Sequence, residues 1–171
     1  DPKNFYLRDI FVFASFTALS FVDIKELSND QIVEVNGEKW IISKRHKTGV
    51  PFQVKLLDIP LQIIERYKAF QENNLVFPNL NYWSICKRMG KMIKECGITK
   101  KISFHCSRHG FATLALSKGM PIESVSRILG HTNIETTQIY AKITVQKLDN
   151  DLTMLSDKLS KSFGNVKMAG I

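Results

Sequence analysis

The chain reads Phe104-His-Cys-Ser-Arg-His-Gly-Phe-Ala-Thr113 and, further on, Leu129-Gly-His-Thr-Asn-Ile-Glu-Thr-Thr-Gln-Ile-Tyr140. These stretches combine imidazoles, which move protons near neutrality, with a guanidinium whose planar fork of donors matches phosphate oxygens. A phenol, whose pKa is near 10, attacks only when a neighbour removes its proton or stabilises its anion. The inventory therefore suits cleavage of a phosphodiester by a tyrosine, although by itself it does not establish that chemistry.

The first stretch is predicted to open a helix. Ser103 is expected to cap this helix, and Gly119 to end it. His105 and Arg108 lie three positions apart and so share one helix face. Free amides and the positive end of the helix dipole make such an N-terminus a natural place for a phosphate, although a histidine and an arginine that only solvate a helix end remain the alternative.

Two shorter helices are predicted to follow. Pro121 suits the first turn of a helix over 122–129, which Gly130 ends. The segment 132–135, Thr-Asn-Ile-Glu, has the spacing of a capping box and opens a short helix that reaches Tyr140. Tyr140 taken alone would more often be a core aromatic residue than a nucleophile.

The rest of the chain predicts a mixed α/β fold that is mainly helical. The pattern gives, in order, a helix over 5–27, a three-stranded antiparallel sheet over 31–57 with a tight turn at Asn36-Gly37, a helix from Pro60, a basic helix over 81–96 and an amphipathic helix over 145–159. We expect a helical catalytic domain with a small sheet over 1–160, followed by a flexible tail over 161–171.

The excess of basic over acidic residues favours a polyanion as partner. Among 171 residues, 24 Lys and Arg outnumber 16 Asp and Glu, which gives a net charge of +8. Nucleic acid is the first candidate for such a charge. No run approaches the ~18 apolar residues that span a bilayer. The start of the chain has no signal-peptide pattern, so no membrane partner is expected. The three cysteines are odd in number and widely spaced, which favours a reducing compartment.

Two basic segments are candidate DNA contacts. Lys44 and Arg45 lie at the tip of the predicted hairpin beside Lys47, a residue that could protonate a leaving oxygen. The basic helix over 81–96 presents candidate contacts to the phosphate backbone at Lys87, Arg88 and Lys91. A charged turn and a charged helix face that are merely solvated remain the alternatives.

Metal binding and simple DNA binding are the other functions to weigh. His105 and His109 lie four apart, but Cys106 stands where the zinc-protease motif needs Glu, so no metal is expected. His109 is interpreted as a partly buried packing residue. The segment 119–129 could belong to the helix-turn-helix of a non-catalytic DNA-binding regulator. Its second helix is mainly apolar, however, which favours packing over groove binding.

The two opening stretches, in this order and with the basic hairpin, resemble the catalytic domain of tyrosine recombinases, the family of phage integrases and chromosome-dimer resolvases. The resemblance covers about 11–151. It implies a nucleophile at Tyr140, the family's His-x-x-Arg pair at His105 and Arg108, its later histidine at His131, and its hairpin lysine at Lys47.

One position departs from the family. The family usually carries a first arginine in a Thr-Gly-Leu-Arg sequence, and here the segment reads Thr17-Ala-Leu-Ser20. Ser20 therefore occupies the arginine position, and Asp23 stands where the family has an acidic residue. This variation resembles integrases of bacterial conjugative transposons. Arg8 and Lys25 are weak candidates for a replacement cation.

The resemblance also implies the reaction and its setting. A tyrosine recombinase cleaves and rejoins DNA through a 3′-phosphotyrosyl link without metal, ATP or another cofactor. We therefore expect double-stranded attachment sites as partners, a homo-tetramer on DNA, a bacterial cytoplasmic location at the nucleoid, and a chain that is the C-terminal part of a longer integrase. A topoisomerase-like enzyme that nicks without a specific site shares this chemistry and remains an alternative.

Overall fold

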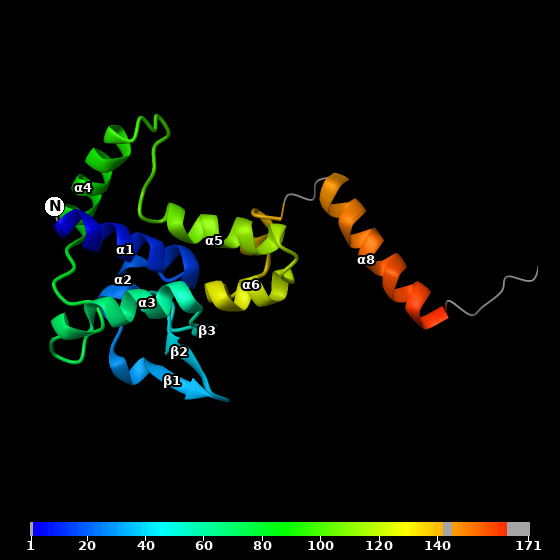
Figure 1. The fold of residues 1–171 in the computed structure, drawn as a ribbon, viewed down its shortest axis with the longest axis horizontal. Helices are drawn as coiled ribbons and strands as arrows, with labels where there is room; N and C mark the ends of the chain where they lie inside the picture. The colour runs from blue at the N-terminus through cyan, green and yellow to red at the C-terminus, as the bar shows by residue number, and fades with distance from the viewer. Residues whose placement is uncertain (1, 142–144, 164–171) are drawn as a thin grey trace, which may run out of the picture. The chain divides into compact units, whose positions relative to one another are not determined.

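The structure, a computed structural model, describes residues 2–141 and 145–163. The chain divides into two compact units, residues 1–140 and 141–171. The first unit combines helices with one three-stranded antiparallel sheet, which confirms the predicted mixed, mainly helical fold (Figure 1). The predicted domain over 1–160 spans this unit and most of the second.

The described residues form eight α-helices and three strands. The helices are α1 (Pro2–Thr17), α2 (Phe21–Lys25), α3 (Asp58–Tyr67), α4 (Tyr82–Glu95), α5 (Cys106–Ser117), α6 (Ile122–Leu129), α7 (Glu135–Gln138) and α8 (Val145–Phe163). The strands are β1 (Ile32–Val35), β2 (Glu38–Lys44) and β3 (Pro51–Lys55), and short 3₁₀ turns occupy Asn29–Gln31 and Lys68–Phe70.

The sheet agrees with its prediction. Its order is β1-β2-β3, with Ile32 opposite Ile41 and Ile41 opposite Val54. Asn36 and Gly37 both adopt positive φ, 52° and 76°, as the tight turn between β1 and β2 requires. The sheet therefore presents β2 as its central strand, and β2 leads directly into the basic hairpin tip.

The predicted helix over 5–27 is wrong in one respect, because it is two helices. Ala18 adopts a left-handed φ of 58° directly after α1. Ser20 then caps α2 by accepting a hydrogen bond from the Asp23 amide, and the Asp23 side chain accepts one from the Ser20 amide in return. This reciprocal capping box stabilises a new helix start and leaves the carbonyl of Ala18 free for a partner from elsewhere.

Two other helix starts differ from their predictions. Ser103 does not cap α5 with its side chain; its carbonyl accepts a hydrogen bond from the Cys106 amide, and α5 begins at Cys106. In front of α7, the side chain of Asn133 caps the amide of Glu135 at 2.9 Å, so Thr132 does not have that role. The predicted ends at Gly119 and Gly130 are confirmed, since both adopt positive φ after a helix.

The core forms around α1, which packs against α3, α4 and α5 (Figure 1). Phe13 meets Phe77 edge to face at 4.9 Å, and Phe104 meets Phe21 at 5.5 Å. In α6, the buried side chains are Val125, Ser126 and Leu129, so this helix faces the interior as its apolar pattern indicates. The core thus fixes the elements on which the opening sequence stretches lie.

The second unit contains α8. Its leucines at 148, 152, 155 and 159 are all exposed. The helix extends to Phe163, so residues 161–163 of the predicted tail are helical, and residues 164–171 lie outside the described part of the chain.

A buried carboxylate joins α1 to α3. Asp9 is 3% exposed and accepts hydrogen bonds from Arg8 at 2.8 Å, Arg66 at 2.5 Å and Tyr67 at 2.8 Å. Burial alone raises the pKa of Asp9, but these three donors more than offset burial and lower the pKa below its ordinary value. The ionised carboxylate is therefore the form that stabilises the fold.

We predict that Asp9→Asn lowers the free energy of unfolding at pH 7 by about 1.5–3 kcal/mol, because hydrogen bonds to a charged acceptor are lost. A carboxyl group with a lowered pKa stabilises the fold above its unfolded pKa of about 3.9, and this contribution disappears as pH falls through the folded pKa. Urea unfolding measured at pH 7 and pH 3 should therefore show that the free energy of unfolding falls less on acidification in Asp9→Asn than in the parent. Glu34→Gln, which changes an exposed carboxylate on β1, is the control. An equal decrease in the free energy of unfolding between pH 7 and pH 3 for the parent and Asp9→Asn would contradict this prediction.

Candidate active site

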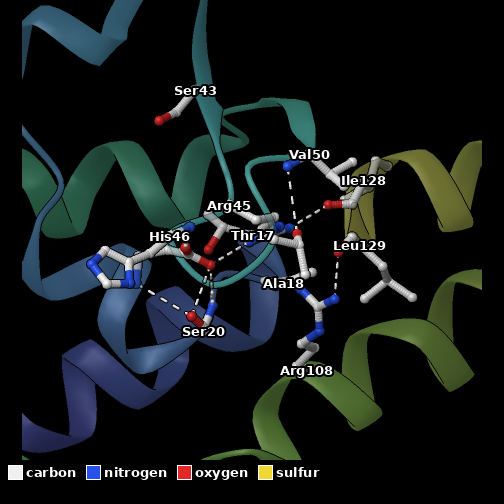
Figure 2. Close-up of polar contacts among 12 residues, drawn as sticks. Thr17, Ala18, Ser20, Ser43, Arg45, His46, Val50, Arg108, Ile128 and Leu129 are labelled. Carbon is white, nitrogen blue, oxygen red and sulfur yellow. Dashed lines mark hydrogen bonds and ion pairs between the residues drawn. The ribbon is translucent and has the colours of Figure 1, made fainter. Parts of the chain in front are cut away.

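Arg108 is held by two backbone carbonyls from distant parts of the chain. The residue is 9% exposed in α5. One of its terminal nitrogens donates to the Ala18 carbonyl at 2.9 Å, and the other donates to the Leu129 carbonyl (Figure 2). The break between α1 and α2 and the end of α6 therefore position this guanidinium. Five N–H donors are present in the group, so donors remain for a ligand.

Arg45 does not lie on an exposed basic tip, which is where the sequence placed it. It is 5% exposed, and its guanidinium donates to Asp23 at 2.7 Å and to the Ile128 carbonyl at 2.5 Å (Figure 2). The guanidinium also lies over the Phe52 ring, 3.9 Å from its centroid. The first residue after β2 therefore turns inward, toward the end of α6 that also binds Arg108.

Gly130 makes room for this side chain. A Cβ atom at position 130 would lie 2.8 Å from Cγ and 2.9 Å from Nε of Arg45, and φ at Gly130 is +60°. Glycine tolerates both the left-handed backbone and the close approach. The Gly130 that ends α6 thus also allows Arg45 to pass.

The two buried arginines act on each other electrostatically. Burial, followed by the positive charge of Arg45, lowers the pKa of Arg108 to about 10, and Asp23 offsets part of this effect. Burial lowers the pKa of Arg45 as well, against the favourable charge of Asp23. One carboxylate therefore faces two guanidiniums. This surplus of positive charge in a partly desolvated place suits a phosphodiester anion.

Ser20, which the sequence resemblance aligns with the family's first arginine, is linked to this cluster through Asp23. The Ser20 hydroxyl donates to Asp23 Oδ2 at 2.8 Å, the same oxygen that binds Arg45. The two weak candidates for a replacement of the first arginine lie elsewhere, since Arg8 pairs with the buried Asp9 and Lys25 is exposed. Arg45 is a cation that binds the same carboxylate oxygen as Ser20.

His131 follows Gly130 and is half-buried. Its Nδ1 lies 2.8 Å from the hydroxyl of Thr137, which fixes the orientation of the ring. Burial first, and then the charges of Arg108 and Arg45, lower the pKa of His131. These effects favour the neutral imidazole. When Nδ1 accepts the hydrogen bond of the Thr137 hydroxyl, Nε2 carries the proton and can donate to an anion.

Tyr140 meets His109 of α5, and His109 in turn meets His105, the residue directly before α5. The half-buried Tyr140 hydroxyl lies 2.6 Å from Nδ1 of His109, and the ring of His105 meets that of His109 at 4.4 Å. Burial raises the pKa of Tyr140, while the charge of Arg108 lowers it in part. The sequence interpretation of His109 as a packing residue missed this polar contact.

The basic residues predicted to contact DNA are distributed over two elements. Lys44 and Lys47 are exposed at the hairpin between β2 and β3, on either side of the inward-turned Arg45. Lys87 and Lys91 are exposed on α4, whereas Arg88 is half-buried and donates to Asn4 at 3.3 Å. Contact of any of them with DNA stays a prediction.

Two structural observations concern metals and membranes. Within residues 2–141 and 145–163, no three His, Cys, Asp or Glu side chains are grouped so that they could hold a metal ion. No helix in those ranges is both long and apolar enough to cross a membrane.

Comparison with known proteins identifies the family. Residues 1–147 match the phage integrase family. The chain belongs to this family. Its relatives include the tyrosine recombinases XerA of Thermococcus kodakarensis, 41% identical over 141 residues, and XerA of Pyrococcus horikoshii, 31% identical over 139 residues. Each alignment covers 73% of this chain and 48% or 47% of the relative, so the chain spans about half the length of these proteins.

Solved structures of similar proteins share the fold. The XerH recombinase in a post-cleavage complex with palindromic difH substrate superposes with a TM-score of 0.69 at 22% identity, covering 88% of this chain and 46% of that one. The Tn1549 transposon integrase in complex with circular intermediate DNA gives a TM-score of 0.69 at 17% identity, covering 86% of this chain and 57% of that one.

Proposed function

We propose that this chain is the catalytic part of a site-specific DNA recombinase that cleaves and rejoins DNA through a 3′-phosphotyrosyl intermediate. The observation that carries the proposal is geometric: Arg45 and Arg108 bind the neighbouring carbonyls of Ile128 and Leu129. His109, the residue after Arg108, lies 2.6 Å from the Tyr140 hydroxyl. This arrangement supports two phosphate-binding cations beside a nucleophile. The family membership and the relatives named tyrosine recombinases support it.

The proposed cleavage is a displacement at phosphorus. The Tyr140 oxygen attacks the phosphodiester and forms a bond to phosphorus, while the bond to the 5′-oxygen breaks. Arg108, Arg45 and His131 donate hydrogen bonds to the non-bridging oxygens, where charge develops. Lys47 gives a proton to the departing 5′-oxygen. Because the covalent link conserves the bond energy, attack by a 5′-hydroxyl reverses the step without ATP.

Arg45 takes the role of the missing first arginine in this proposal. It reaches the carboxylate that Ser20 contacts, and it binds the carbonyl of Ile128, next to the Leu129 carbonyl that holds Arg108. The second guanidinium thus comes from the hairpin after β2 instead of from the segment between α1 and α2.

Covalent trapping tests the function. The full-length protein is incubated with duplex DNA from the end of the element that encodes it, nicked a few bases from the cleavage site so that the released 5′-hydroxyl strand diffuses away. A recombinase accumulates a protein–DNA adduct that survives denaturation. A non-catalytic regulator binds the same DNA and forms no adduct. A topoisomerase-like enzyme relaxes supercoiled plasmids that lack the site, which a site-specific recombinase leaves unchanged.

The assembly and the location are part of the same proposal. Double-stranded attachment sites are the partners, and four protomers act together on two paired sites. The exposed leucines of α8 offer an apolar face for packing within one protomer or between protomers. A recombinase with chromosomal sites acts at the nucleoid, in the cytoplasm of a bacterial cell.

We predict that the double change of Lys87 and Lys91 to Ala weakens DNA binding and flattens its salt dependence. Each phosphate contact contributes a slope of about 0.9 in log K against log salt, so loss of both lowers the slope by about 1.8. Fluorescence anisotropy of labelled duplex over a salt series measures this. Lys68→Ala, at an exposed lysine 3.3 Å from Glu65, is the control and should keep the parent slope. An unchanged slope in the double variant would remove α4 from the DNA interface.

A further inference from the structure

His109 and Tyr140 meet in a way that the family resemblance does not assign. The Tyr140 hydroxyl oxygen lies 2.6 Å from His109 Nδ1, and the two ring centroids are 5.3 Å apart with their planes at 52°. His109 lies on α5, directly after Arg108, whereas Tyr140 follows α7. Both side chains are half-buried. Two separate elements therefore bring an imidazole nitrogen onto the oxygen that is proposed to attack phosphorus.

We propose that His109 is a catalytic residue that accepts the proton of the Tyr140 hydroxyl during cleavage and returns it during rejoining. The inference rests on the recombinase function proposed above. Among the described residues, the hydrogen bond to the Tyr140 oxygen is made by His109, while His105 contacts the ring of His109 and is itself exposed. The contact thus points to His109, and not to His105 of the family's His-x-x-Arg pair, as the group that accepts this proton.

The tautomer follows from the contact. For Nδ1 to accept the tyrosine proton, the neutral ring of His109 must carry its own proton on Nε2. A cationic ring would present N–H groups at both nitrogens and could accept nothing. The neutral form of His109 is therefore the one that is competent for cleavage.

Other charged and titratable groups surround the contact between His109 and Tyr140. The charged and titratable groups at this place are Tyr140, His105 and Arg108, with His131 after α6. Burial, then His109 and then Arg108, lower the pKa of His105. The lowered pKa makes His105 a weaker proton acceptor, whereas the hydrogen bond to the Tyr140 oxygen is made by His109.

The proton balance closes without another reactant. In cleavage, the Tyr140 proton moves to His109 Nδ1, the phenolate oxygen bonds to phosphorus, and the departing 5′-oxygen takes a proton from Lys47. In rejoining, the attacking 5′-hydroxyl returns its proton to Lys47 as it bonds to phosphorus. The phenolate that leaves recovers its proton from His109. One imidazole and one amine thus act on opposite sides of the same phosphorus.

Two substrates distinguish a group that acts on the leaving 5′-oxygen from a group that acts on the Tyr140 oxygen. One is the nicked duplex described above, and the other carries sulfur in place of the bridging 5′-oxygen at the scissile phosphate. A thiolate leaves without protonation because its pKa is far below that of an alkoxide. The sulfur substrate therefore bypasses a group that acts on the leaving strand, such as Lys47, but not a group that acts on Tyr140.

His109→Asn is the informative variant, because its amide oxygen accepts a hydrogen bond but cannot take up a proton. We expect single-turnover cleavage at saturating protein to slow by about 100-fold, the usual size of general-base catalysis. The sulfur substrate should not restore this rate, whereas it should restore the rate of Lys47→Ala. Melting temperature and non-covalent DNA binding of the variant are measured to exclude a folding defect, and His109→Phe serves as a second variant that removes the acceptor.

Two results would overturn the proposal: a parent-like rate for His109→Asn, or restoration of its rate by the sulfur substrate. The failure of the proposed function has another signature. If the parent protein forms no adduct, or if Tyr140→Phe forms as much, the recombinase assignment fails and the role of His109 fails with it.

Discussion

Tyr140→Phe should abolish the covalent protein–DNA adduct while leaving DNA binding intact. The change removes one oxygen atom, the one that is proposed to bond to phosphorus. The ring remains and can still pack beside His109. Loss of a nucleophile costs at least about 10⁴-fold in rate, which takes the adduct below detection in a denaturing gel. Anisotropy with the same duplex should give an affinity within about twofold of the parent.

Tyr82→Phe is the matched control. Tyr82 is 45% exposed at the start of α4, where its ring packs 5.1 Å from Phe21. Removal of its hydroxyl should change neither the amount of adduct nor the binding affinity. An adduct of parent yield from Tyr140→Phe, with the same electrophoretic mobility, would mean that another group attacks the phosphate.

Much of the fold was predictable because its signals are local. Asn36-Gly37 specifies a tight turn from two adjacent residues, and Gly130 ends α6 by a left-handed conformation that glycine adopts readily. The break after α1 has a local signal too: Ser20 and Asp23 have the spacing of a capping box. The apolar residues on both sides of the break continue one helical pattern, and this pattern led to the prediction of a single helix over 5–27.

The site was less predictable because its decisive contacts join distant residues. A run of basic residues in a hairpin turn usually faces water, and nothing within the run shows that Arg45 turns inward. Its burial depends on Asp23, on the Ile128 carbonyl and on the space beside Gly130. The contact of His109 with Tyr140 likewise spans 31 positions in the chain. The sequence motifs therefore identify the chemical groups, whereas tertiary packing determines which of these groups are in contact.

Arg45→Ala should slow single-turnover cleavage by about 100- to 1000-fold, since it removes a preorganised donor from the developing charge on phosphate. It should also destabilise the fold by about 3–5 kcal/mol, because Asp23 is left as a buried carboxylate without its ion-pair partner. Cleavage is therefore measured well below the melting temperature of the variant. Arg45→Lys retains the charge but loses the fork of donors, so its rate should lie between those of the parent and Arg45→Ala.

Arg66→Ala separates the catalytic loss from the loss of stability. This substitution also removes a guanidinium from a buried carboxylate, since Arg66 of α3 pairs with Asp9 of α1 at 2.5 Å. Because this ion pair is not part of the proposed site, the Arg66→Ala protein should cleave at the parent rate.

The converse experiment adds Ser20→Arg to Arg45→Ala. The Ser20 hydroxyl lies 2.8 Å from Asp23 Oδ2, so an arginine there can pair with the same carboxylate and should recover at least about tenfold in rate. Parent-like cleavage by Arg45→Ala would show that Arg108 stabilises the phosphate without a second arginine. A decrease that Arg66→Ala matches at equal stability would assign the effect to folding alone.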